Sequence, residues 1–281
     1  MPNEPILPEN FSVAEDFQQG AILYLIGAGP GDPELLTIKA LKILNSVDLV
    51  MFDNLVDRRI LDYIENPNIE TVFSGKGVGE SFKQQDINKN ILSALKQGKT
   101  VARLKGGDPL IFARGIEEAQ VAIENGFKVE VIPGLTTAFS AAAINNKTLT
   151  LRNKVDSVIL ATGHELNEEK FQIWTQALKS KHVLILYMAL RNIVTITDRL
   201  KEELGANFPV TAIYKASLID QKVLDSDLEH VSQEIINQKF ESPVIFYFGK
   251  DINHLNNIKP TLELSNARLA SFKKPEFTSS K

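Results

Sequence analysis

Short apolar runs rich in β-branched residues alternate with amphipathic stretches along most of this chain, and that alternation constrains its fold more than any other feature. Leu35, Ile38 and Leu41 recur at helical spacing after the first apolar run, and further helices are expected at 87–95 and 116–125. An order of strand, helix, strand and helix predicts a mainly parallel sheet with helices on both faces. The strands expected in the first half cover residues 21–26, 48–52, 69–73, 100–104 and 128–132.

The second half of the chain repeats this alternation, and the 281 residues suffice for two domains of about 100–150 residues each. We therefore predict an α/β protein with two α/β/α domains whose sheets are mainly parallel or mixed. The strands expected in this half are 157–161, 183–187, 210–214, 222–224 and 244–248, with helices at 168–178, 193–204 and 227–238. The predicted division is a flexible acidic arm (1–20), an N-terminal domain (21–138), a linker region (139–154), a C-terminal domain (155–255) and a tail (256–281).

Composition and charge exclude several classes of function. The chain has no cysteine, which removes disulfide frameworks, thiolate zinc sites and cysteine nucleophiles and fits a cytoplasmic location. The formal net charge of −4 arises from four acids in residues 1–20, so the neutral remainder lacks the basic surface of a nucleic-acid binder. The longest apolar run, 183–190, is far below the roughly 20 residues that cross a bilayer. The four histidines show no helical metal spacing, so we expect neither a membrane span nor a metal site.

Glycine is concentrated in the first half of the chain, where 13 of the 16 glycines lie at or before Gly134. Glycine lets the backbone adopt positive φ and approach a ligand closely. Ligands of open α/β sheets bind outside the carboxyl ends of the strands. Although any single loop is more simply a tight turn, the four together predict one shared rim with a ligand site. The glycines at expected strand ends are Gly27, Gly29 and Gly31; Gly75, Gly77 and Gly79; Gly106 and Gly107; and Gly134.

The first of these loops, residues 27–33, superficially matches a dinucleotide-binding fingerprint. The match fails because Asp32 stands where the third glycine is required. Pro30 and Pro33 also remove backbone N–H groups that a pyrophosphate would use. A nicotinamide dehydrogenase is therefore a weak alternative, and a rigid wall beside a ligand is the better interpretation of this loop.

Two further loops carry polar groups at the expected rim. Asp108 follows Gly106 and Gly107. Its carboxylate could accept hydrogen bonds from ribose hydroxyls or from an ammonium group. The simpler interpretation is that it caps a helix starting at Pro109, and it could do both. Thr136 follows Gly134 at the start of another expected helix, where free N–H groups face the rim and capping is the simpler interpretation.

Asp53 and Lys76 also fall on this rim, because Asp53 ends the second strand and Lys76 lies between Gly75 and Gly77. A carboxylate and an amine that face one cleft can act as proton acceptor and proton donor. Each alone is more often a surface charge. Met188 ends a strand in the second half and is a candidate apolar ligand contact, although a core methionine is the commoner case.

Taken together, these motifs resemble the tetrapyrrole (corrin/porphyrin) methylases over about residues 22–250. The most specific strings are Gly-Ala-Gly-Pro-Gly-Asp-Pro at 27–33 and Gly-Gly-Asp-Pro-Leu-Ile-Phe at 106–112. The turn at 75–79, the string 131–138 and Thr-Gly-His at 162–164 add to the match. The resemblance implies an S-adenosyl-L-methionine-dependent enzyme that works as a homodimer, with its cofactor in a cleft between two α/β domains. Among the members, the motifs are most similar to those that methylate uroporphyrinogen III at two ring carbons to give precorrin-2, which feeds sirohaem and cobalamin synthesis.

The resemblance also assigns roles to individual residues. It places the proton acceptor at Asp53 and the proton donor at Lys76. Because the substrate carries many carboxylates, the site needs cations, for which Lys105, Arg114 and Arg152 are the candidates besides Lys76. The residues expected to contact the cofactor are Pro30, Gly106, Gly107, Asp108, Ile111, Thr136, Thr137, Met188 and Ala216.

The second half departs from the family pattern and leaves alternatives open. Ala189 and Ala216 stand where glycine is expected, and Thr137 stands where alanine is usual. The string 213–217 is similar to the corresponding string of the cobalt-precorrin-4 methyltransferases. A later corrinoid methyltransferase is therefore the first alternative, and a non-catalytic binding protein with the methylase fold is the second.

Overall fold

The computed structural model describes residues 20–74 and 84–252. The chain divides into two compact units: the first comprises residues 1–28 and 36–134, and the second comprises residues 29–35 and 135–281. Each unit is built on a sheet of five strands. The predicted arm, the tail and the turn at 75–79 lie wholly or almost wholly outside the described residues.

The sheet of the first unit is entirely parallel, as the alternation of strands and helices predicts. Its strands are β1 (Ile22–Gly27), β2 (Leu49–Phe52), β3 (Glu70–Phe73), β4 (Val101–Lys105) and β5 (Lys128–Ile132), in the order β3-β2-β4-β1-β5. Ile26 pairs with Leu104 on one side and with Ile132 on the other. The carboxyl ends of β4, β1 and the edge strand β5 therefore lie next to one another.

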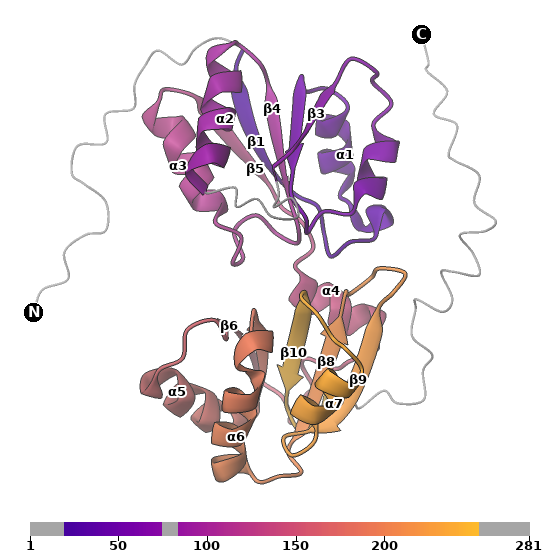
Figure 1. Cartoon of the computed structure of the whole chain (residues 1–281), viewed down its shortest axis with the longest axis vertical. Coiled ribbons are helices and arrows are strands. Elements are labelled where there is room, and N and C mark those ends of the chain that lie inside the picture. Colours follow the sequence, from indigo (N-terminus) through magenta and orange to yellow (C-terminus); the bar gives the residue numbers. More distant parts are fainter. Residues whose placement is uncertain (1–19, 75–83, 253–281) are drawn as a thin grey trace, which may run out of the picture. The chain divides into compact units, whose positions relative to one another are not determined.

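Helices cover both faces of this sheet (Figure 1). α1 (Ile38–Leu44) packs its Ala40 and Leu44 on one face, and α2 (Gln84–Lys96) and α3 (Gly115–Glu124) pack on the other. Short 3-10 turns, η1 (Pro33–Leu35) and η2 (Arg58–Tyr63), complete the connections. Gly98, with φ +81°, follows the end of α2, because a left-handed residue stops a helix at little cost only when it lacks a side chain.

The sheet of the second unit is mixed. Its strands are β6 (Ser157–Thr162), β7 (His182–Tyr187), β8 (Pro209–Tyr214), β9 (Lys222–Asp227) and β10 (Val244–Phe248), in the order β6-β7-β10-β8-β9. β6 and β7 are parallel, whereas β7 with β10, β10 with β8 and β8 with β9 are antiparallel. The carboxyl ends of β6 and β7 are thus neighbours, with Thr162 opposite Tyr187.

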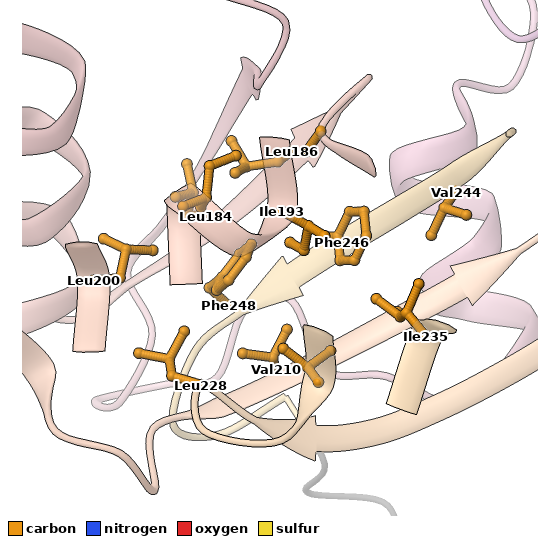
Figure 2. Packing of buried hydrophobic residues seen from close by; sticks show 14 of the residues in the cluster. Leu184, Leu186, Ile193, Leu200, Val210, Leu228, Ile235, Val244, Phe246 and Phe248 are labelled. Atoms are coloured by element: carbon orange, nitrogen blue, oxygen red, sulfur yellow. The ribbon is translucent and has the colours of Figure 1, made fainter. Parts of the chain in front are cut away.

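Apolar layers on the two faces of this sheet hold the second unit together. α5 (Glu168–Lys179), α6 (Ile193–Leu204) and α7 (Val231–Asn237) pack on one face, and α4 (Thr137–Ile144) packs on the other; η3 (Leu190–Asn192) precedes α6. Figure 2 shows Phe246 and Phe248 of β10 among side chains of α6 and α7. Each such side chain, when fully buried, contributes about 1.5–3 kcal/mol to folding.

Several observed boundaries differ from the expected ones, and two of the differences have a clear physical cause. The division falls after Gly134, so α4 belongs to the second unit, where its buried Ala138, Ala141 and Ala142 pack on β7 and β10. β9 continues to Asp227 because it pairs with β8 along its whole length, and α7 begins only at Val231. None of the described helices is long and apolar enough to cross a membrane.

Candidate active site

The glycine loops of the first unit meet at the carboxyl ends of β1, β4 and β5. A Cβ atom added to Gly27 would lie 2.5 Å from the Gly134 Cα and 2.7 Å from the Gly107 carbonyl oxygen. A Cβ on Gly106 would lie 2.7 Å from the Leu55 Cβ. Real side chains do not tolerate such distances, so these glycines are needed for the loops to pack against each other. The predicted meeting of these three strand ends is confirmed, and the ligand site at this rim stays a prediction. The loop at 75–79 lies outside the described residues.

Asp108 connects two loops of this rim. Its Oδ2 accepts a hydrogen bond from the Gly134 N–H at 3.1 Å, and its Oδ1 accepts one from the Leu110 N–H at 2.9 Å. The prediction that Asp108 caps a helix starting at Pro109 is wrong, because α3 begins only at Gly115. The carboxylate is held in one orientation and keeps spare acceptor capacity, since its two oxygens offer about four lone-pair sites.

The backbone between this rim and α3 adopts conformations that are rare for residues with side chains. Phe112 has φ +53° and Arg114 has φ +57°, and Ile111 before them is half-buried. Such strain clusters at functional sites, where the surrounding structure maintains it. The Arg114 side chain is 58 % exposed and forms an ion pair with Glu117 at 2.6 Å. The hydrogen bond between them raises the pKa of Arg114 and lowers that of Glu117.

Asp53 follows β2 and is fixed at both of its carboxylate oxygens. Oδ1 accepts a hydrogen bond from the Leu55 N–H at 3.0 Å, and Oδ2 accepts one from Arg103 Nη2 at 2.8 Å. The side chain is 23 % exposed, so solvent reaches it from one side. Because Leu55 also contacts Gly106, the Asp53 turn lies beside the glycine rim within the first unit.

Behind Asp53 lies a buried charge cluster that consists of Arg103, Lys105 and Glu118. Lys105 Nζ donates to Glu118 Oε1 at 2.9 Å, and Arg103 Nε lies 3.4 Å from the same oxygen. All three side chains are at most 5 % exposed. Burial lowers the pKa of Lys105 and the charge of Arg103 lowers it further, while Glu118 opposes that shift. This geometry does not favour the predicted contact between Lys105 and a substrate carboxylate, because the ammonium already has a buried partner.

In the second unit, Thr136 and Met188 lie next to a shared tyrosine. The Tyr187 hydroxyl lies 2.6 Å from Thr136 Oγ1 and accepts a hydrogen bond from the Ala138 N–H at 3.0 Å. Thr136 is the N-cap residue of α4, but its side chain makes no capping bond, and Tyr187 takes that place. Met188 follows with φ +52° and is 52 % exposed. Met188 is therefore not a core residue, although a core position is the commoner interpretation of a methionine at the end of a strand.

The loop at 29–35, which includes Pro30, is attached to the same unit beside Ala216. The Asp32 N–H donates to Ser217 Oγ at 2.9 Å, and a Cβ on Gly31 would lie 2.6 Å from a Leu218 methyl carbon. Ala216 is buried in the apolar cluster that contains Ala138 of α4 and against which Tyr187 packs. The residues predicted near the cofactor in this unit therefore converge on one end of its sheet.

Some predicted residues stand apart from these groups, and some functional candidates were missed. Lys76 lies outside the described residues, and Arg152 is exposed in the turn between α4 and β6. The sequence interpretation missed Tyr187, Arg103 and Glu118. A signal for Arg103 was available, because a cation in the otherwise apolar string Val-Ala-Arg-Leu of a central strand requires a buried partner.

Comparison with known proteins places these features in a family. The sequence profile of the Tetrapyrrole (Corrin/Porphyrin) Methylases matches residues 22–232. The chain belongs to the tetrapyrrole methylase family. The resemblance noted in the sequence is thereby confirmed, and the two α/β units described above are those of a tetrapyrrole methylase.

Relatives within the tetrapyrrole methylases show what this chain is similar to. It is 35 % identical over 235 residues to the uroporphyrinogen-III C-methyltransferase of Bacillus subtilis, covering 83 % of this chain and 91 % of that one. A uroporphyrin-III C-methyltransferase of Thermus thermophilus, solved with S-adenosylhomocysteine, superposes with a TM-score of 0.69 at 27 % identity, over 86 % of this chain and 99 % of that one. A cobalt precorrin-4 methyltransferase shares the fold, with a TM-score of 0.72 at 24 % identity over 81 % of this chain and 94 % of that one.

Proposed function

We propose that this tetrapyrrole methylase uses S-adenosyl-L-methionine to methylate uroporphyrinogen III at two ring carbons, which gives precorrin-2. The observation that carries the proposal is the packed glycine rim beside Asp53, whose carboxylate is fixed and partly exposed. This site lies in a chain that is 35 % identical over 235 residues to a uroporphyrinogen-III C-methyltransferase. Precorrin-2 is the branch compound toward sirohaem and cobalamin.

The residues present fit the cofactor in both units. In the first unit, the proposed contacts Gly106, Gly107, Asp108 and Ile111 follow the end of β4, and the Asp108 carboxylate has capacity left to accept hydrogen bonds from ribose hydroxyls. In the second unit, Pro30, Thr136, Thr137, Met188 and Ala216 are the proposed contacts. The exposed thioether of Met188 suits a neighbouring sulfonium, because it is apolar and polarisable.

The bound cofactor supplies a methyl group on a sulfonium: a nucleophilic ring carbon forms the new C–C bond, the C–S bond breaks, and its electron pair stays on sulfur in S-adenosylhomocysteine. The methylated ring then carries a positive charge until a proton leaves. Asp53 is the proposed acceptor of that proton, because its carboxylate is oriented by hydrogen bonds at both oxygens and is partly exposed. Lys76 remains the proposed proton donor.

The substrate carboxylates need cations, for which Arg114 and Arg152 are the better candidates. Both side chains are exposed, whereas Lys105 is buried and already paired with Glu118. Arg114 is held by Glu117 close to the strained segment after the rim, so its guanidinium is oriented before substrate arrives.

A homodimer and a cytoplasmic location complete the proposal. Exposed apolar side chains of the first unit, Leu110, Phe112 and Ile116, support a protein contact there. Size-exclusion chromatography with light scattering tests the dimer: twice the mass of 31.2 kDa supports it, and a single-chain mass contradicts it.

The function is tested by incubating the pure protein with methyl-labelled S-adenosyl-L-methionine and either uroporphyrinogen III or cobalt-precorrin-4, under anaerobic conditions. We expect label in the product of uroporphyrinogen III. Label only with cobalt-precorrin-4 would instead identify a later corrinoid methyltransferase, and cofactor binding without transfer to either substrate would identify a binding protein. The D53N variant should bind S-adenosylhomocysteine with unchanged affinity and lose most of its methylation; full turnover by D53N would refute the proton role of Asp53.

A further inference from the structure

The buried charge cluster behind Asp53 has no role in the function proposed above. We propose that Glu118 is a positioning residue for the catalytic Asp53 carboxylate, acting through the guanidinium of Arg103. The inference rests on the proposed function, because it requires Asp53 to accept the proton that leaves the methylated ring.

Arg103 joins the two carboxylates through different nitrogen atoms. Its Nη2 donates to Asp53 Oδ2 at 2.8 Å, its Nη1 donates to the Leu104 carbonyl at 2.7 Å, and its Nε lies 3.4 Å from Glu118 Oε1. A guanidinium is a rigid planar fork, so contacts on its other nitrogen atoms restrict where Nη2 points. The hydrogen bond from Nη1 to the Leu104 carbonyl and the ion pair between Nε and Glu118 together restrict the direction of the bond to Asp53.

A contribution to folding stability does not explain the buried charge cluster well. Arg103 is 2 % exposed and Glu118 is fully buried, and replacing such a pair with apolar side chains is often neutral or stabilising. Two of its buried atoms, Arg103 Nε and Glu118 Oε2, have no hydrogen-bond partner in the part of the chain that the structure describes. Leaving such atoms unpaired costs stability. The cost of these unpaired atoms makes stability a poor explanation for the cluster.

Glu118 also binds Lys105, the second cation of the cluster. Its Oε1 accepts hydrogen bonds from Lys105 Nζ at 2.9 Å and from the Gln84 side-chain amide at 3.1 Å. Arg103 and Lys105 are thus balanced by Glu118 and Asp53. Without the charge of Glu118, two buried cations would share one carboxylate, and Asp53 would be drawn toward the interior and away from the substrate side.

The test compares E118Q, which keeps the shape and removes the charge, with E118D, which keeps the charge. The control is E124Q, the same substitution at an exposed position of the same helix. Each protein is titrated with S-adenosylhomocysteine for binding stoichiometry and Kd, and then assayed for kcat and KM with uroporphyrinogen III. We expect kcat of E118Q per bound site to fall on the order of 10- to 100-fold, with Kd and KM within about twofold of wild type. E118D should recover part of that loss, and E124Q should match wild type.

A purely structural role for Glu118 would lower the binding stoichiometry, and kcat per bound site would stay unchanged; that result overturns the proposal. Turnover of E118Q equal to wild type also overturns it. If E118Q does not fold, R103K decides instead, because lysine keeps the buried cation but lacks the fork: a fall in kcat per bound site supports the proposal, and unchanged turnover contradicts it. Failure of the wild-type protein to methylate uroporphyrinogen III would count against the proposed function, whereas active wild type with unaffected E118Q counts only against the role of Glu118.

Discussion

Replacing Gly27 with alanine should destabilise the protein through lack of space, not through backbone strain. The added Cβ would lie 2.5 Å from both the Cα and the N of Gly134, and 2.7 Å from the Gly107 carbonyl oxygen. All three are backbone atoms at the ends of strands in one sheet, so no flexible side chain can move aside. Inserting a methyl group into such a packed region costs about 1–3 kcal/mol.

Gly98 offers a matched control with the opposite properties. It has φ +81° and no atom within 4 Å of an added Cβ, so G98A tests conformation without crowding. The left-handed conformation costs alanine roughly 1–2 kcal/mol. Alanine also restricts the unfolded chain by about 0.4–1 kcal/mol, and this gain applies to both variants. We expect G98A to cost less than G27A, because three backbone atoms crowd the added methyl group only at Gly27.

Thermal unfolding followed by circular dichroism measures both variants. A change of 1 kcal/mol shifts Tm by about 2–4 °C for a large single chain, so a cost of about 1–3 kcal/mol lowers the Tm of G27A by about 2–12 °C, and the Tm of G98A should fall between those of G27A and wild type. The Kd for S-adenosylhomocysteine should rise for G27A alone, because the displaced loop carries Gly107. A G27A protein as stable as wild type, or more stable than G98A, would refute the packing of the three strand ends.

Two further substitutions test other parts of the structure. Y187F removes the hydroxyl that is hydrogen-bonded to Thr136 and to the Ala138 N–H. Unfolding in urea should therefore show a free energy of unfolding about 1–3 kcal/mol lower, and S-adenosylhomocysteine should bind more weakly. Unchanged stability and binding would contradict the role given to Tyr187. Hydrogen bonds from the Thr100 backbone and hydroxyl lower the pKa of Asp48 below 3.8, so its contribution to stability is present above pH 3.8 and is lost as the pH falls through the folded-state pKa. D48N should therefore be less stable than wild type at pH 7, with a gap in urea midpoint that narrows below pH 3.8; a gap independent of pH would contradict this assignment.

Most of the fold could be predicted because strands and helices have their own residue periods. β5, α6 and β10 begin and end at the residues expected from the pattern. The antiparallel pairing in the second unit could not be predicted, since β10 comes last among the described strands and yet pairs between β7 and β8. The position of a strand within a sheet depends on contacts between distant segments, and local periodicity does not record them.

The candidate site was predictable where glycine marks it and hidden where side chains from distant segments meet. The glycine clusters indicated the rim of the first unit. The contact between Arg103 and Asp53 joins residues 50 positions apart, and that between Tyr187 and Thr136 joins residues 51 apart. Only the unusual placement of Arg103 in an apolar strand pointed to the first, and no local signal pointed to the second.

The number of methyl groups that one tetrapyrrole receives tests the central claim most directly. Uroporphyrinogen III is incubated anaerobically with the pure protein and trideuteromethyl-labelled S-adenosyl-L-methionine, and the mass of the product is measured by mass spectrometry. We predict that each product molecule carries two labelled methyl groups on ring carbons. A tetrapyrrole that returns unlabelled from a protein shown to bind S-adenosylhomocysteine would contradict the account.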